Sequence, residues 1–151
     1  MQALAWQAHY DTGLPQIDAE HRDLLELINQ LDHDRNEISP RSLGHQLAAL
    51  DRFIRAHFEH EQALMAEAGY ALIGAHRQLH NVFCRRLDQY RERHRRGENI
   101  GMELHAMLQR WVVDHIHGDK SYSGPVYTHM RQRQDPRGGG WINRTMRAVF
   151  N

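Results

Sequence analysis

Residues 39–69 read SPRSLGHQLAALDRFIRAHFEHEQALMAEAG and predict one long helix. The stretch opens on a serine, a good helix N-cap, and on a proline, which is favoured at the first helical position; it closes on a glycine, which is common just after a helix. Apolar side chains recur between these ends at the helical spacing, at Leu43, Leu47, Leu50, Ile54, Phe58, Leu64 and Met65. His57 and Glu61 fall on the same stripe, one turn apart. The buried face of this helix is therefore expected to carry an imidazole and a carboxylate.

Three further segments repeat the helical period. The first contains Ile17, Leu24, Ile28 and Leu31, with Asp18 as its expected N-cap. The next contains Ile73, Leu79, Phe83, Leu87 and Tyr90 and stops near Gly97. The last contains Leu104, Leu108, Trp111, Val112 and Ile116 and fades after Tyr122. Because the connections are short, neighbouring helices should be antiparallel, and we predict an all-α fold, an up-down-up-down antiparallel four-helix bundle.

The two ends of the chain differ from its body. Residues 1–16 are expected to form a non-helical arm laid across the bundle, which occupies residues 1–122. Residues 123–151 form a basic extension: five arginines and one aspartate give +4, which leaves −4 for the rest of a chain of zero formal charge. An apolar pattern follows the glycine triplet at 138–140. The extension is therefore either a solvated tail or a short amphipathic helix that docks on a partner protein, a second subunit or an anionic surface.

The composition excludes several classes of protein. A chain of 151 residues suits one compact domain, and nineteen basic residues balanced by nineteen acidic ones argue against a basic nucleic-acid binder and against an acidic disordered chain. Cys84 is the only cysteine, so no intramolecular disulfide is expected. The N-terminal residues lack a signal-peptide pattern, and no apolar run approaches the roughly 18 residues that a membrane span needs. These features predict a cytoplasmic protein without a membrane span.

Histidine is abundant, at thirteen residues, and helical phasing places five of them inward together with two carboxylates. The inward polar residues are His21, His57, Glu61, His76, His80, His115 and Asp119. A single inward histidine is more often a hydrogen-bonded core residue than a ligand. Here all four predicted helices carry such residues on their apolar faces, which favours one shared polar site inside the bundle. The other eight histidines mostly fall off the apolar stripes and are expected at the surface.

A metal centre would explain this set. Unpaired carboxylates in an apolar interior cost several kcal/mol each, and metal ions neutralise them while using the imidazole lone pairs. Seven ligands are too many for one tetrahedral zinc ion and suit two first-row metals bridged by the carboxylates. With mixed nitrogen and oxygen ligands and no thiolate, iron is the natural choice and manganese the alternative. No glutamate is followed three residues later by histidine, which argues against the ferritin-like carboxylate sites.

Several motifs resemble the hemerythrin family, in particular its bacterial members, the bacteriohemerythrins. The matching stretches are Ile17-Asp18-Ala19-Glu20-His21, His57-Phe58-Glu59-His60-Glu61, Tyr70 followed by His76-x-x-x-His80, and Trp111-Val112-Val113-Asp114-His115-Ile116 with Asp119 and Tyr122. The match spans roughly residues 6–122, and the residues after about 123 have no counterpart in it. The order of the motifs is specific to the family.

This resemblance implies a non-haem di-iron site that binds O2 reversibly. By that resemblance, O2 would take electrons from both irons and a proton from a bridging hydroxide, and would be held as hydroperoxide. By the family pattern, His76, His80 and His115 would hold one iron, His21 and His57 would hold the other, and Glu61 and Asp119 would bridge them. Trp111, Val112 and Ile116 would line an apolar O2 pocket. His115 and Asp119 are four residues apart where the family usually has five. Gln62 stands where a second glutamate is common, and we expect this position to face outward.

The leading hypothesis is an O2 carrier, store or sensor without substrate turnover, and therefore not an enzyme. Two alternatives belong to other classes: a di-iron oxidase, peroxidase or nitric-oxide-handling enzyme, and a signalling module in which the basic extension reports the state of the site. The expected ligands are two iron ions and O2. The expected partners include no nucleic acid, and self-association or a protein partner could act through residues 123–151.

Overall fold

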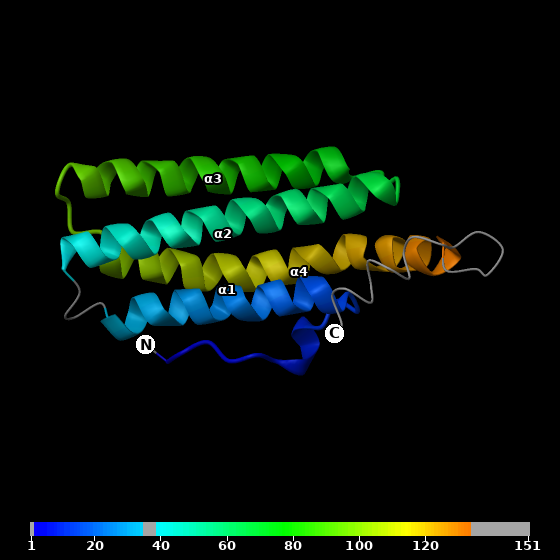
Figure 1. Cartoon of the computed structure of the whole chain (residues 1–151), viewed down its shortest axis with the longest axis horizontal. Coiled ribbons are helices and arrows are strands. Elements are labelled where there is room, and N and C mark those ends of the chain that lie inside the picture. Colours follow the sequence, from blue (N-terminus) through cyan, green and yellow to red (C-terminus); the bar gives the residue numbers. More distant parts are fainter. Residues whose placement is uncertain (1, 35–38, 134–151) are drawn as a thin grey trace.

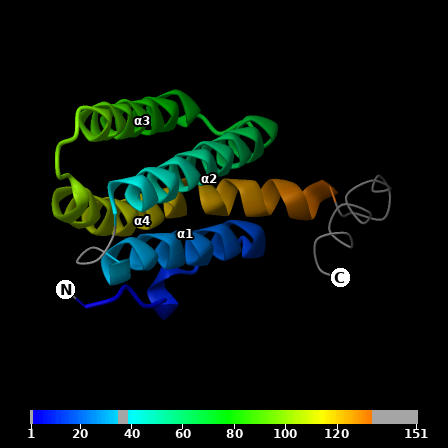
Figure 2. The same cartoon turned by 60° about the vertical axis from the view of Figure 1, so that its left-hand side comes forward.

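The computed structural model describes residues 2–34 and 39–133. It confirms the all-α four-helix bundle, and the described residues contain no strand. The helices are α1 (Pro15–Asp34), α2 (Pro40–Glu67), α3 (Ile73–Arg95) and α4 (Gly101–Arg133). Figures 1 and 2 show them as an elongated bundle in which α1 packs against α2 and α4, and α2 packs against α3.

The ends of the helices follow the local signals in the sequence. Ser39 caps α2, because its Oγ accepts a hydrogen bond from the Ser42 N–H at 3.1 Å. Gly69 and Gly97 follow α2 and α3 with φ of +67° and +84°, a conformation in which a side chain would be strained. At Gly69 the backbone closes a Schellman motif, with hydrogen bonds from its N–H to the Ala66 carbonyl and from the Tyr70 N–H to the Met65 carbonyl.

The N-terminal arm lies along α1 (Figure 1). The Asn29 side chain of α1 holds the arm by two hydrogen bonds to the backbone of Leu4, at 2.8 and 2.7 Å. The arm contains one short 3-10 helix, η1 (Ala8–Tyr10), and α1 already begins at Pro15. The expectation that Asp18 is the N-cap of the first helix is therefore wrong. Asp18 lies in the first turn and accepts hydrogen bonds from the backbone N–H and hydroxyl of Thr12, at 3.0 and 2.8 Å.

The fourth helix is longer than predicted. It does not end near Tyr122 but continues through Pro125 to Arg133. A proline inside a helix costs about 3 kcal/mol or more, partly because one hydrogen bond to the preceding turn is lost. Here the carbonyl that loses its partner belongs to Ser121, an exposed residue that water can reach. Tyr122 and Val126 are buried on the same face, and their burial offsets the cost. The predicted apolar pattern after residue 140 lies outside the described residues.

The core has two apolar parts. The larger cluster fills most of the bundle and includes Leu24 of α1, Phe58 of α2, Phe83 of α3 and Ile116 of α4. The smaller cluster consists of Leu14, Ile17, Met65, Tyr122 and Val126. In sequence, His21, Glu61 and Asp119 stand between members of the two clusters, and His57 and His115 directly precede the last larger-cluster residues of α2 and α4. The fold therefore places a polar layer between two apolar ones.

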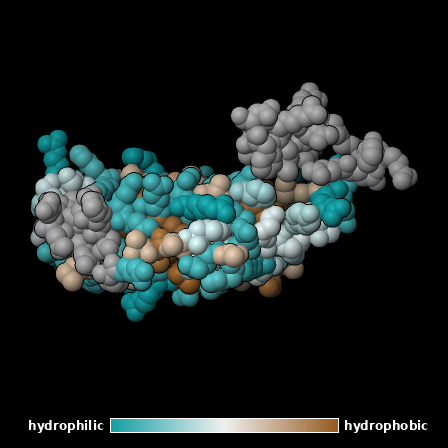
Figure 3. Space-filling view, turned by 90° about the horizontal axis from the view of Figure 1, so that it is seen from below, coloured by the Kyte–Doolittle hydropathy of each residue, from teal (hydrophilic) through white to brown (hydrophobic). Residues whose placement is uncertain are grey.

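The surface is mainly polar on the face shown in Figure 3, where a few hydrophobic side chains gather near the middle. None of the described helices combines the length and apolar character that a membrane crossing would need.

Candidate metal centre

The seven predicted residues converge in one buried layer, which we call the polar layer. Its members are His21 from α1, His57 and Glu61 from α2, His76 and His80 from α3, and His115 and Asp119 from α4. All seven side chains are buried, and Glu61 and Asp119 are 0% exposed. Water is a poor partner for groups at this depth, so they must satisfy one another or bind ions.

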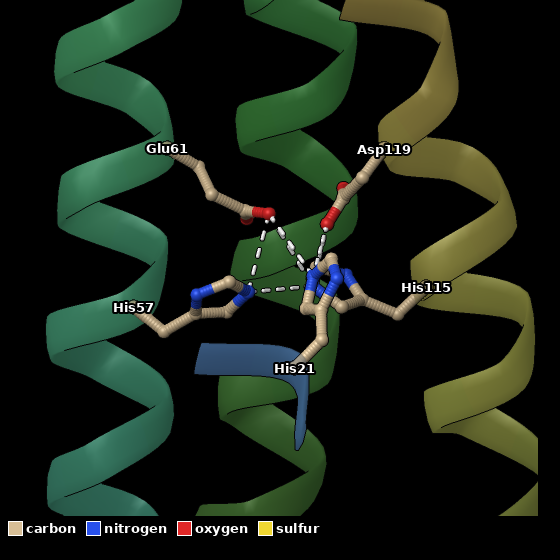
Figure 4. A group of neighbouring side chains, drawn as sticks. All are labelled: His21, His57, Glu61, His115 and Asp119. Carbon is tan, nitrogen blue, oxygen red and sulfur yellow. Dashed lines mark hydrogen bonds and ion pairs between the residues drawn. The ribbon is translucent and has the colours of Figure 1, made fainter. Parts of the chain in front are cut away.

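The first ligand group contains His21, His57, Glu61, His115 and Asp119, with one ligand atom from each within 4.8 Å of the others. Figure 4 shows these side chains pointing toward one another from α2, from α4 and from α1, which is cut short in the view. His57 Nε2 lies 3.2 Å from Glu61 Oε1 and 3.0 Å from His115 Nε2. Asp119 Oδ2 lies 2.8 Å from His21 Nε2 and 3.0 Å from His115 Nε2. The three imidazoles of this group thus lie around one oxygen of Glu61 and one oxygen of Asp119.

The second ligand group contains His76 and His80 together with the same two carboxylates. His76 Nε2 lies 3.1 Å from Asp119 Oδ1, and His80 Nε2 lies 3.2 Å from Glu61 Oε2. Each carboxylate therefore turns one oxygen to each group, which is the arrangement that bridging ligands require. The geometry places His115 in the first group, whereas the family pattern assigns it to the ion held by the α3 histidines. That assignment stays a prediction.

Protons balance the charges of the metal-free polar layer. Burial disfavours a charged imidazole, yet Glu61, Glu20 and Asp119 together raise the pKa of His57 to about 10. Burial also opposes the charge on His21, but hydrogen bonds to Asp119 and Glu61 raise its pKa. His80 differs, because burial lowers its pKa and the neighbouring Glu61 does not compensate.

The two carboxylates stay ionised despite their depth. Burial alone would raise the pKa of Glu61, but His115, His57 and His21 hold it well below its ordinary value. For Asp119 the same opposition between burial and His115 leaves the pKa lowered. Tyr122, which is 0% exposed, donates a hydrogen bond to Glu61 Oε1 at 2.8 Å. Burial and the two carboxylates raise the pKa of Tyr122, so its hydroxyl remains a donor.

His57 and His80 each have a hydrogen-bond partner at Nδ1, the ring nitrogen on the far side from the carboxylates of the layer. The spacing of apolar residues along the helices predicted neither of these two partners. His57 Nδ1 lies 2.8 Å from Glu20 Oε2, and the other oxygen of Glu20 lies 2.8 Å from His60 Nδ1. His80 Nδ1 lies 2.9 Å from the side-chain amide of Gln62. The expectation that Gln62 faces outward is therefore wrong. The one available signal was adjacency, because Glu20 and Gln62 directly neighbour His21 and Glu61 in the sequence.

Buried polar atoms without a hydrogen-bond partner indicate whether the layer fits metal ions. Glu61 Oε2 and His80 Nε2 are buried and have no hydrogen-bond partner, although they lie 3.2 Å apart. Unsatisfied polar groups at this depth are costly, and a metal ion between ligand atoms removes the cost. Five imidazoles and two carboxylates without a thiolate match the preferences of iron or manganese. The residues present therefore fit a metal centre.

A cavity of about 240 Å³ opens between α3 and α4 beside the polar layer. Its lining includes His76, His80, His115 and Asp119 as well as apolar residues such as Phe83 and Trp111. Trp111 stacks on the ring of His115, with the ring centroids 4.9 Å apart. Val112 and Ile116, the other two predicted pocket residues, do not line this cavity and are fully buried in the larger apolar cluster.

Known proteins are similar to this chain in sequence and in fold. A family model described as the hemerythrin HHE cation binding domain matches residues 12–125. Bacteriohemerythrins from Stenotrophomonas maltophilia (strain R551-3) and Pseudomonas aeruginosa (strain LESB58) are 36% and 34% identical over 152 residues, covering 99% of each chain. A crystal structure of wild-type hemerythrin has a TM-score of 0.78 at 23% identity and covers 83% of this chain and 98% of its own. The two bacterial relatives therefore also align with the basic extension, which was expected to have no counterpart.

Proposed function

Because the chain belongs to the hemerythrin family, we propose that it binds dioxygen reversibly at a centre of two non-haem iron ions. One observation carries the proposal: two overlapping ligand groups share Glu61 and Asp119, and each carboxylate offers one oxygen to each group. A single metal ion would leave one group uncompensated. Two ions use all seven members of the polar layer.

The ligand assignment follows the family pattern. His76, His80 and His115 would hold one ion, and His21 and His57 would hold the other. Glu61 and Asp119 would bridge the two. When bound, the iron pair supplies the electrons and the open ligand position that dioxygen binding needs.

The chain supplies enclosure and orientation. The apolar clusters on both sides of the polar layer limit the water that reaches it, which disfavours the loss of reduced oxygen species. The Tyr122 hydroxyl, donating to Glu61 Oε1, fixes that carboxylate. Glu20, accepting from His57 Nδ1–H, orients the ring so that Nε2 faces the layer. The four helices thus hold the ligand atoms in place before any ion arrives.

Iron quantitation with optical spectroscopy tests the proposal. We expect two iron ions per chain after loading, oxo-bridged di-iron absorption in the oxidised protein, and a spectral change that reverses when dioxygen is removed from the reduced protein. Fewer than about one iron per chain would refute the site. Two irons without a reversible change would refute the function and leave the site standing.

The cavity between α3 and α4 favours a second candidate function. It brings His76, His80 and His115 to a partly apolar pocket large enough for a small molecule. A di-iron oxidase, peroxidase or nitric-oxide-handling enzyme would need such access. Steady consumption of dioxygen, peroxide or nitric oxide with an added reductant, beyond slow autoxidation, would favour this enzyme over the binding protein.

A further inference from the structure

Gln62 and Glu61, adjacent residues of α2, each face one of the two nitrogens of the same imidazole ring. The ring belongs to His80 of α3. Its Nε2 faces Glu61 Oε2 at 3.2 Å, and its Nδ1 lies 2.9 Å from Gln62 Nε2. His80 also stacks on Phe58, with the ring centroids 3.7 Å apart and the planes nearly parallel. The stacking fixes the plane of the imidazole, so the groups that face its two nitrogens decide which nitrogen carries the proton.

The tautomer of His80 depends on what Gln62 offers. In the geometry described, the Gln62 amide N–H donates to Nδ1, and a neutral ring then carries its proton on Nε2. A metal ion needs the lone pair of Nε2, so the proton must move to Nδ1 and find an acceptor there. Rotation of the Gln62 amide by half a turn presents its carbonyl oxygen in the same place. Glutamine can therefore support both forms of the ring.

The partner of His57 contrasts with this arrangement. Its Nδ1 faces the Glu20 carboxylate at 2.8 Å, and an ionised carboxylate only accepts hydrogen bonds. Glu20 therefore supports only the form of His57 in which Nδ1 carries a proton. A glutamate at position 62 would impose the same restriction on His80 and would add a negative charge beside the layer. The two ligand histidines thus have partners of different capability.

We propose that Gln62 is a positioning residue of the metal centre, which donates to His80 Nδ1 in the metal-free protein and accepts from it when Nε2 binds a metal ion. The inference rests on the metal centre of the proposed function but not on dioxygen. The amide reverses its role as the ion binds, so His80 keeps a hydrogen-bond partner in both states. The ring of His80 is then held in place before loading and oriented for its ion afterwards.

The test compares Gln62→Met with the matched control Gln78→Met. Gln78 is an exposed residue of α3, two positions from His80. Methionine has a similar length but offers Nδ1 no comparable partner. We expect Gln62→Met to bind cobalt(II), titrated into metal-free protein, about 10- to 100-fold more weakly, whereas the control binds like the wild type. Equal affinity in the two folded variants would overturn the proposal.

A second readout separates positioning from mere packing. Nitrogen-15 NMR of the histidine rings reports which nitrogen of His80 carries the proton. In the wild type we expect Nε2–H without metal and Nδ1–H with zinc(II) bound. In Gln62→Glu we expect Nδ1 to carry a proton even without metal, because the carboxylate can only accept; Gln78→Glu should keep the wild-type pattern. A Gln62→Glu ring with the wild-type metal-free tautomer would contradict the proposal. Neither experiment uses dioxygen, so the proposed function can fail while this inference holds, and the reverse.

Discussion

Glu61→Gln should destabilise the metal-free protein more than any surface change. The carboxylate accepts from the Tyr122 hydroxyl at 2.8 Å and has His57 Nε2 at 3.2 Å, and both residues are buried. At an effective dielectric constant of about 20, one imidazolium at that distance attracts the carboxylate by about 5 kcal/mol. Removing one partner of a buried pair leaves the other uncompensated and costs about 3–5 kcal/mol net. At about 2–4 °C per kcal/mol, the melting temperature should fall by about 6–20 °C.

Metal content gives the second measurement on the same variant. Because Glu61 belongs to both ligand groups, its loss should leave fewer than two ions per chain after loading. Glu59→Gln is the matched control, since Glu59 lies two residues earlier on α2 and is exposed. Calorimetry of the metal-free variants and metal analysis of the loaded ones compare the pair. If Glu61→Gln has the same melting temperature as Glu59→Gln and still binds two ions per chain, the inference that Glu61 is shared by both ligand groups is refuted.

Three further predictions concern a hydrogen bond to the layer, the charge on His57 and the end of a helix. Tyr122→Phe removes a hydrogen bond to a buried charge and should lower the free energy of unfolding by about 1.5–3 kcal/mol in a urea titration; an unchanged midpoint would mean that Glu61 finds another donor. The pKa of His57 is raised from 6.5 to about 10, so the stability that it contributes to the metal-free protein is fully present below pH 6.5 and is lost as the pH rises toward 10. Urea midpoints of metal-free protein should therefore fall across that window, and a flat profile would contradict the shift. Gly97→Ala forces a side chain into φ of +84° and should cost about 1–2 kcal/mol, whereas substitution at the helical, exposed Gly74 should not destabilise.

Helical phasing was enough to predict the members of the polar layer. Each member stands in line with apolar residues of its own helix, such as Ile17 and Leu24 on either side of His21, and burial of the stripe carries the polar residue inward. That inference needs only the period of a helix. It does not need the relative rotation of two helices, which is why it succeeded without a structure.

The partners of the ligands could not be predicted in the same way. Glu20 and Gln62 lie beside the stripes and reach their histidines across to a neighbouring helix, so their roles depend on how α1, α2 and α3 are rotated against one another. The prediction of where α4 ends was wrong for a related reason. A local rule stops a helix near Pro125, but Val126 packs against residues of α1 and α2, and this tertiary contact outweighs the rule.

The polar layer also explains how one sequence can fold before it receives its metal. Two ionised carboxylates lie between apolar clusters, a position that would be prohibitive without nearby positive charge. In the metal-free protein the pKa of His57 is raised to about 10, so its imidazole keeps a proton that supplies positive charge, and the raised pKa of His21 favours the charged form of that ring too. Metal ions need the same nitrogen lone pairs, so loading must release protons, and the affinity for metal must weaken as the solution becomes more acidic. Protons and metal ions thus compete for one set of atoms, and the bundle is compensated in either state.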